Sequence, residues 1–329
     1  VMPGHRRITI YFDDMLYFFT TKLPDSYVQT LIKIHLRGRE MVASKLSVGN
    51  TEILVLHDNE TSLPLSMTFP DVSPQEWLPY QEQYPEGFNG VDNLKAHFEC
   101  YLIRSEGRTI LVDTGLGGNE TNAGSVEAFA GGVGGRLLEE MRGAGIARED
   151  IDTVFFSHLH PDHVGWNLVK NDHGVAVPTF PRARYMAHQA DWEVMRKPEV
   201  QEAFPAPFWD ETLGPLETLG VAESITGEHF LTREITAIPT PGHTPGSMGL
   251  VIKSEGQVAL ILGDVFHNPA QITETDWVFS FDMDPSVAIQ TRKQMIDRAE
   301  HENAIVGICH HSGFGRILRA EGKRYWQAI

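Results

Sequence analysis

The chain has 329 residues, of which 41% are hydrophobic, and this composition is typical of a globular protein with a substantial core. Its 27 basic and 44 acidic residues give a formal charge of −17, which disfavours partners such as nucleic acid or an anionic membrane surface. No apolar run approaches the roughly 18 residues that a membrane-spanning helix needs. Cys100 and Cys309 lie far apart and are expected to be buried free thiols, which favours a cytoplasmic location.

The first forty residues differ from the rest of the chain. Residues 11–19 are aromatic but include Asp13 and Asp14, which is unlike the apolar centre of a secretory signal. Residues 25–36 carry apolar side chains at helical spacing, which predicts a short helix. We expect residues 1–40 to be an N-terminal extension, which either packs on a partner subunit in a homodimer or derives in part from an upstream start site.

The next part of the chain alternates strand and helix patterns. Runs of β-branched and aromatic residues predict strands at residues 52–56, 98–103, 109–112 and 153–156. Before the last of these, residues 134–144 place Leu137, Leu138 and Met141 on one face of a helix that Gly145 would end. Strands and helices in this alternation indicate an α/β fold.

The strand expected at residues 153–156 leads into the densest group of metal-binding side chains. His158, His160, Asp162 and His163 lie within six positions. Imidazole and carboxylate groups are the ligands that hold Zn²⁺ and similar ions, and ligands on a short loop leaving a rigid strand lose little entropy on binding. A solvated, histidine-rich loop is the alternative interpretation. The spacing predicts a metal site.

Further candidate ligands follow strands in the second half of the chain. Strands are expected at residues 184–187, 235–238, 249–252, 258–262 and 304–308, and a helix at residues 285–301. His243 and Asp264 each lie a few residues beyond one of these strands, and His310 and His311 follow the last. Because successive side chains on a strand point to opposite faces, we expect one of these two histidines to reach a common site, and we favour His310.

The pattern H-x-H-x-D-H at residues 158–163 resembles the signature of the metallo-β-lactamase superfamily. Four other segments are similar to family elements in the same order: residues 109–115 (TILVDTG), 240–247 (TPGHTPGS), 260–264 (LILGD) and 305–311 (IVGICHH). The resemblance covers the chain from about Leu46 to its C-terminus. It implies a four-layer αββα sandwich as the catalytic domain, residues 41–329, with metal ligands along one edge.

The resemblance also implies two metal ions. One would be held by His158, His160 and His243, the second by Asp162, His163 and His310, and both by Asp264. His311 is the alternative to His310 as a ligand of the second ion. Zn²⁺ is the expected ion, with Mn, Fe and Co as alternatives, because histidine and aspartate suit all of them. Asp113 is expected to fix a ligand imidazole through its free N–H, although an aspartate before Thr-Gly can also simply cap a turn.

Two residues are expected to be catalytic. Asp162 would orient the nucleophile as well as bind metal. His267 stands where lactonase-like relatives carry a tyrosine that contacts the substrate, so it could donate a proton to the leaving oxygen. The alternative for His267 is a surface histidine without a role.

The ligand set favours ester substrates. Asp264 stands where one large group of β-lactamases has a cysteine, and Gly313-Phe314-Gly315-Arg316 resembles the lactonase and methyl-parathion-hydrolase-like branch. We therefore predict a hydrolase that uses a metal-bridging hydroxide to open a small-molecule lactone or carboxylic ester, with phosphotriesters as side substrates. The alternatives are a β-lactamase, a thioester hydrolase, an iron-dependent oxidoreductase on the same fold, and a metal-bound ligand sensor with little turnover. Residues 167–181 and 197–215 are expected to form long loops or a helical insert that walls the pocket.

Overall fold

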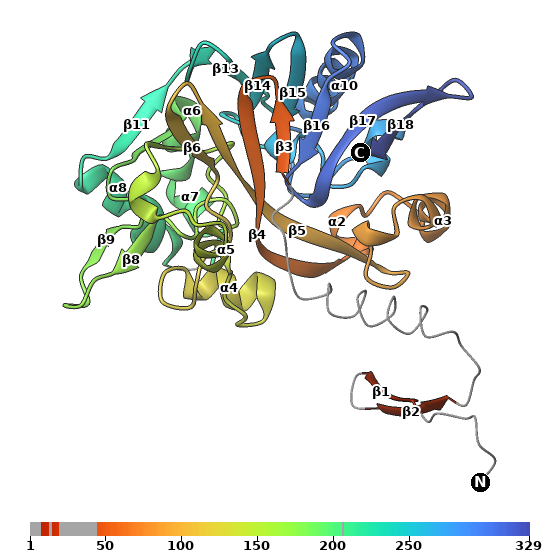
Figure 1. Cartoon of the computed structure of the whole chain (residues 1–329), viewed down its shortest axis with the longest axis horizontal. Coiled ribbons are helices and arrows are strands. Elements are labelled where there is room, and N and C mark those ends of the chain that lie inside the picture. The colour runs from red at the N-terminus through yellow and green to blue at the C-terminus, as the bar shows by residue number, and fades with distance from the viewer. Residues whose placement is uncertain (1–7, 13–14, 20–44, 206) are drawn as a thin grey trace. The chain divides into compact units, whose positions relative to one another are not determined.

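A computed structural model of the chain describes residues 8–12, 15–19, 45–205 and 207–329 (Figure 1). The chain divides into two compact units, Val1–Val42 and Ala43–Ile329. In the first unit, strands β1 (Ile8–Phe12) and β2 (Met15–Phe19) pair antiparallel. The helix expected at residues 25–36 lies outside the described residues, and the assignment of residues 1–40 as an extension stays a prediction.

The larger unit contains two seven-stranded sheets. The first has the order β11-β10-β7-β6-β5-β4-β3 and the second the order β12-β13-β14-β15-β16-β17-β18. The strands of the first sheet are β3 (Lys45–Val48), β4 (Thr51–Pro64), β5 (Asn93–Ser105), β6 (Arg108–Val112), β7 (Thr153–Phe155), β10 (Arg184–His188) and β11 (Ala222–Ile225). Those of the second are β12 (His229–Phe230), β13 (Ile235–Pro239), β14 (Met248–Ser254), β15 (Gln257–Ile261), β16 (Ile305–Ile308), β17 (His311–Ala320) and β18 (Lys323–Ala328).

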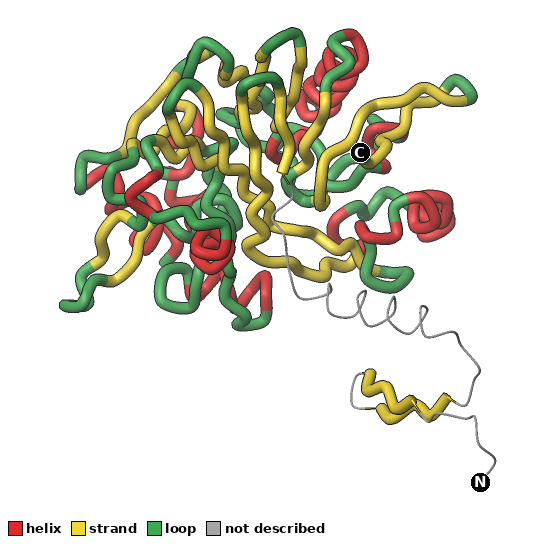
Figure 2. Tube along the Cα trace, in the orientation of Figure 1, coloured by secondary structure: helices red, strands yellow, loops and turns green. Residues whose placement is uncertain are grey.

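Helices cover the outer faces of both sheets, as Figure 2 shows. The helices are α2 (Leu65–Thr68), α3 (Pro74–Gln83), α4 (Ala123–Ala130), α5 (Leu137–Gly143), α6 (Gln189–Met195), α7 (Pro198–Gln201), α8 (Gly214–Thr218), α9 (Ala270–Thr273) and α10 (Pro285–His301). None of them in the described part of the chain combines the length and apolarity that crossing a membrane would take. A further two-stranded sheet, β8 (Leu168–Lys170) with β9 (Ala176–Pro178), projects from the first half.

Alternating side chains on the central strands pack into different cores. On β5, Tyr101 and Ile103 face the core between the two sheets, whereas Cys100 and Leu102 face the core beneath α5 and α6. Because residues i and i+2 on a strand share a face, a strand covered on both sides is apolar at nearly every position. The predicted four-layer αββα sandwich is confirmed. Cys100 and Cys309 are buried and free.

The last crossover of the fold brings two distant strands together. β15 and β16 are parallel neighbours, and the chain between them forms α10. Asp284 caps this helix by accepting a hydrogen bond from the Val287 N–H at 3.1 Å, and Pro285 occupies its first turn, where no N–H is needed. The predicted bounds of this helix, residues 285–301, are confirmed. The loops after β15 and β16 therefore leave the same edge of the sheet side by side.

Candidate metal centre

The loop that follows β7 is held by a buried carboxylate. Asp113, just after β6, accepts hydrogen bonds from the Ser157 N–H and the Ser157 hydroxyl, both at 2.7 Å. Its Oδ2 also lies 2.9 Å from Nδ1 of His163. Asp113 has a φ of 59°, a left-handed conformation that turns its side chain into this loop. It therefore has the contact expected of a residue that orients the His163 ring.

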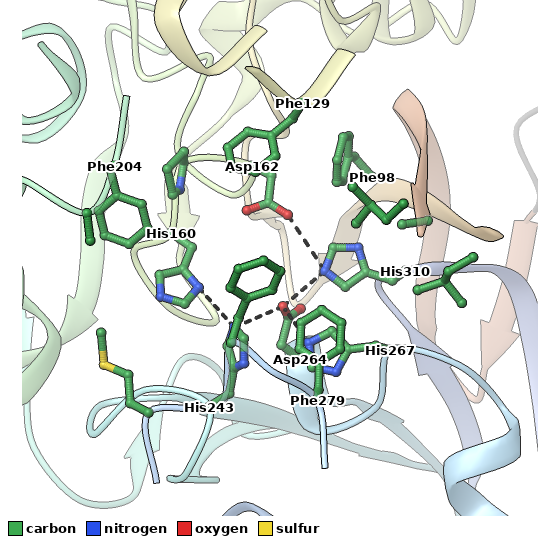
Figure 3. A pocket seen from close by; sticks show the side chains of 17 residues that line it. Phe98, Phe129, His160, Asp162, Phe204, His243, Asp264, His267, Phe279 and His310 are labelled. Atoms are coloured by element: carbon green, nitrogen blue, oxygen red, sulfur yellow. Dashed lines mark hydrogen bonds and ion pairs between the residues drawn. The ribbon is translucent and has the colours of Figure 1, made fainter. Parts of the chain in front are cut away.

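Five of the seven predicted ligands, His160, Asp162, His243, Asp264 and His310, line one end of a pocket (Figure 3). The other two, His158 and His163, are grouped with them by the positions of their ligand atoms. Nε2 of His310 lies 3.0 Å from Oδ2 of Asp264, and Nε2 of His243 lies 3.2 Å from the same oxygen. Nε2 of His163 lies 3.4 Å from Oδ1 of Asp264 and 3.5 Å from Oδ2 of Asp162. His243 Nε2 also faces Nδ1 of His160 at 2.9 Å. Asp264 thus stands at the middle of the group.

The side chains form two groups of three. The ligand atoms of His158, His160 and His243 lie within 4.8 Å of one another, and so do those of Asp162, His163 and His310. Zn–N distances of about 2.0 Å place ligand atoms of a tetrahedral site roughly 3.4 Å apart. The spacings observed around Asp264 fall in this range, so the two groups are of the right size to hold one ion each.

Several atoms of the centre lack the partners that buried polar groups normally have. Nε2 of His158, Nε2 of His163 and Oδ1 of Asp264 are buried without a hydrogen-bond partner. An unsatisfied buried polar atom costs about 1–3 kcal/mol. A cation between these nitrogens and oxygens would satisfy them together, so the residues present fit a metal.

The charge states suit metal binding. Burial lowers the pKa of His158 and of His160 well below the usual value, so both imidazoles are neutral and have a free lone pair. Burial raises the pKa of Asp264, but the facing rings of His310 and His163 outweigh this effect and hold it well below its usual value. Burial lowers the pKa of His163 and of His310, but the facing carboxylates, above all Asp264, outweigh this effect and raise both pKa values. His158, His160 and the carboxylates are therefore already in the forms that bind a cation, whereas a cation would displace a proton from His163 and from His310.

His310 and His311 point to different parts of the molecule, but not for the predicted reason. We expected alternation along one strand, whereas β16 ends at Ile308 and His310 lies in the turn before β17. His310 lines the pocket. His311 packs against Trp326, with ring centroids 4.8 Å apart, and its Nε2 lies 3.4 Å from a carboxylate oxygen of Glu86. The reversal of the chain, rather than the pleat of a strand, separates the two imidazoles.

Comparison with known proteins agrees with this arrangement. The family model described as the metallo-beta-lactamase superfamily matches residues 99–310. The chain belongs to this superfamily. The uncharacterized protein YobT of Bacillus subtilis (strain 168) is 27% identical over 240 residues, covering 70% of this chain and 88% of that protein. An N-acyl homoserine lactonase of a Bacillus species is 27% identical over 222 residues, covering 64% and 80%.

Solved structures of other superfamily members share the fold. AidC, described as a dizinc quorum-quenching lactonase in complex with a product, matches with a TM-score of 0.72 at 21% identity, covering 87% of this chain and 97% of AidC. The hydrolase AbOPH matches with the same TM-score, identity and coverage. The prediction of a metal-dependent hydrolase of the metallo-β-lactamase superfamily is confirmed by these relatives.

His267 is buried in the centre and is not the surface histidine of the alternative interpretation. Its ring stacks on Phe279 at a centroid distance of 3.5 Å, and its Nε2 lies 3.3 Å from Oδ2 of Asp264. Burial lowers the pKa of His267 to about 4, so the ring is neutral at pH 7. A neutral imidazole keeps one N–H, which can be donated to an oxygen in the pocket.

The pocket beyond the polar centre is apolar and has a volume of about 320 Å³. Its apolar wall consists of Leu63, Leu94, Ala96, Phe98, Phe129, Pro161, Ala203, Phe204, Phe279, Phe281 and Met283. Ala203 and Phe204 belong to the segment at residues 197–215, as predicted, and this segment includes α7 and the start of α8. The loop at residues 167–181 was expected to contribute as well, but it forms the β8–β9 hairpin and none of its residues is among those lining the pocket. None of the described lining residues is a lysine or arginine.

Three buried carboxylates that support the centre were missed from the sequence. Asp282 Oδ1 lies 3.0 Å from Nδ1 of His243. Asp191 accepts hydrogen bonds from the Leu159 N–H at 3.1 Å and the Gly246 N–H at 2.7 Å, so it ties the loop after β7 to the loop of His243. Asp58, on β4, accepts hydrogen bonds from backbone N–H groups after β6 and at α5. None of these three aspartates stands at a sequence spacing from the candidate ligands that would mark it as part of the centre, so the local sequence does not identify them.

Asp282 gives a direct test of how the His243 ring is held. We expect Asp282→Asn to weaken zinc binding by about 10- to 100-fold, because the amide removes the charge that orients the ring and makes its other nitrogen more basic. Competition with a chromophoric chelator measures the affinity. Asp210→Asn, at an exposed aspartate, is the matched control. Equal affinities in the two variants would contradict a role for Asp282.

Proposed function

We propose that this chain hydrolyses a neutral lactone, or another carboxylic ester with an apolar chain, with two Zn²⁺ ions at the centre. The observation that carries the proposal is the position of the two ligand groups, which share Asp264 at the end of an apolar pocket. Relatives described as N-acyl homoserine lactonases, and the likeness to AidC, described as a dizinc lactonase, support both the reaction and the metal.

In this proposal the ligands are those predicted from the sequence. His158, His160 and His243 would hold one ion, Asp162, His163 and His310 would hold the other, and Asp264 would contribute to both. Two divalent ions so placed would lower the pKa of a water between them and polarise the substrate carbonyl. His163 and His310 face Asp162 and outweigh its burial, so its pKa lies below the usual value and it stays ionised. Asp162 lines the pocket. Its carboxylate would accept a hydrogen bond from the attacking water there.

The apolar wall positions the substrate and excludes water. Phe98, Phe129 and Phe204 surround the approach to the centre in Figure 3. An acyl chain that packs against these rings is removed from contact with water. Each methylene buried in this way contributes about 0.8 kcal/mol to the binding free energy. The scissile carbonyl is then held at the polar end, where the N–H of the neutral His267 ring donates a hydrogen bond that stabilises the departing alkoxide.

The charge of the pocket separates this proposal from the alternatives. β-Lactam antibiotics and coenzyme A thioesters carry anionic groups at neutral pH, and a site for them normally supplies a cation. The described residues that line this pocket include no lysine or arginine, whereas an acyl lactone is uncharged and apolar. The pocket therefore favours the lactone over both.

A substrate panel tests the proposed reaction. We expect kcat/KM for acyl lactones to rise about three- to fourfold per added methylene until the pocket is filled. Phe204→Ala should weaken this dependence, whereas Phe230→Ala, at a ring that is 71% exposed, should not. Aryl esters, a phosphotriester, an acyl-coenzyme A and a chromogenic cephalosporin complete the panel. A cephalosporin or thioester turned over faster than every lactone would overturn the proposal.

The assignment of His310, rather than His311, as a metal ligand can be tested separately. We expect His310→Ala to lose one zinc ion per chain and most of kcat, because this imidazole faces both Asp162 and Asp264. His311→Ala removes a ring that packs outside the pocket and should keep both ions. Elemental analysis after dialysis gives the metal content. Loss of metal in His311→Ala alone would transfer the role to that residue.

His267 is tested by the nature of the leaving group. His267→Phe keeps a flat ring against Phe279 but removes the N–H. We expect it to retain both ions and to slow hydrolysis of an alkyl lactone by ~10²-fold, the scale on which removing one hydrogen-bond donor to a developing oxyanion acts. A nitrophenyl ester, whose phenolate leaves without a proton, should be affected much less. Equal losses on the two substrates at unchanged metal content would exclude His267 as the donor.

A further inference from the structure

We propose that β4 and β5 carry a third divalent-cation site, outside the pocket, formed by His57, Glu60, His97 and Glu99. Phe98, between the last two, lines the pocket. Because successive side chains on a strand point to opposite faces, His97 and Glu99 share the face of β5 that turns away from the pocket. The site is therefore separate from the centre proposed for catalysis, and the inference goes beyond the proposed function.

A bulge in β4 places the other two side chains on that same face. His57 pairs with Glu99 and Glu60 pairs with His97, and the register shifts between His57 and Asn59. Residues three apart on a regular strand point to opposite faces, so the extra residue is what brings His57 and Glu60 together. The extra residue, Asp58, is itself fully buried and accepts hydrogen bonds from the interior. The four side chains are thus gathered by a specific feature of the backbone.

The ligand atoms converge at distances that suit an ion. Nδ1 of His57 lies 3.2 Å from Oε1 of Glu99, in a hydrogen bond that an ion bound by both groups would replace, and Nδ1 of His97 lies 3.9 Å from that oxygen. Nδ1 of His97 also lies 3.9 Å from Oε2 of Glu60. These spacings lie on either side of the roughly 3.4 Å expected between ligand atoms of a tetrahedral zinc site. They are too long for hydrogen bonds from His97 but leave room for a cation among the atoms.

Two of these groups are buried and incompletely paired. The His97 and Glu99 side chains are only 9% and 2% exposed. Nδ1 of His97 and Oε2 of Glu99 have no hydrogen-bond partner. A buried carboxylate that is not fully paired is costly, and a divalent ion would satisfy both groups at once. Two imidazoles and two carboxylates form a ligand set suited to Zn²⁺.

The surroundings allow an ion to reach the site. Glu60 is 49% exposed and His57 is 20% exposed, so the site is open to solvent on one side. Lys95 lies 2.8 Å from Oε2 of Glu60 and is the competing cation. An incoming ion must displace this exposed ammonium group or use the other oxygen of Glu60. A surface ion pair of this kind contributes at most about 1 kcal/mol, so it is readily exchanged.

The proposed site is connected to the catalytic centre by one stretch of backbone. The His310 ring donates from Nδ1 to the His97 carbonyl at 2.9 Å, and the His97 N–H donates to the His310 carbonyl at 3.2 Å. The Glu99 N–H donates to the Cys309 carbonyl at 3.2 Å. An ion that fixes His97 and Glu99 would therefore also hold the turn that carries His310. We assign it a positioning role.

Metal content tests the site. The full chain and its His57→Ala and Glu60→Gln variants are dialysed against increasing Zn²⁺ and the ions per chain are counted. We expect His57→Ala to hold one ion fewer than the wild-type protein, and Glu60→Gln to need about tenfold more zinc to acquire that ion. His301→Ala, at an exposed histidine on α10, is the matched control and should equal the wild type. The difference between wild type and variant does not depend on how many ions the catalytic centre holds, nor on any hydrolase assay.

A second measurement guards against a variant that folds poorly. The Tm of the wild-type protein should rise again as zinc is added after the catalytic centre is filled, because an ion bound only by the folded state stabilises it. The Tm of Glu60→Gln, changed at a half-exposed position, should rise less at the same zinc concentration. Identical metal content and identical Tm curves in the wild type and both variants would overturn the proposal.

Discussion

The buried carboxylate of Asp264 is the group on which the rest of the centre depends. Five imidazoles have a nitrogen within 3.7 Å of its oxygens, and they come from loops that follow β7, β13, β15 and β16. A charge buried this deeply is tolerated only when it is paired from several directions. The strand ends of both sheets must therefore meet at one edge, and the four-layer packing of apolar strands and helices brings them there.

The fold, and the group of residues that the structure brings together as candidate ligands, could be predicted because their signals are local. His158 to His163 stand in one short segment, and apolar runs mark the strands that precede each later ligand. The α3 helix was missed because Pro79 lies inside it, and β17 and β18 because many of their side chains are exposed or only partly buried. A hairpin that is covered on one face has no continuous apolar run to mark it.

The supporting residues and pocket walls could not be read from the sequence, for a different physical reason. Asp282 contacts His243 across 39 positions, and Asp191 contacts Leu159 across 32. The apolar wall combines Leu63, Phe129 and Phe281 from three distant segments. Such contacts exist only after the chain has folded, so their residues look like any other aspartate or phenylalanine. The assignment of His310 was made from strand alternation, although the structure separates the two histidines by a turn.

The parallel pairing of β15 with β16 links metal affinity to folding. Asp264 and His310 flank the α10 crossover and approach to 3.0 Å only when that helix has packed and the two strands have joined. An ion that needs both residues binds the folded chain and not the unfolded one, so it draws the equilibrium toward the complete second sheet. In a cell, the supply of that metal would then set the amount of intact protein as well as its activity, because chains without the ion would be more exposed to degradation.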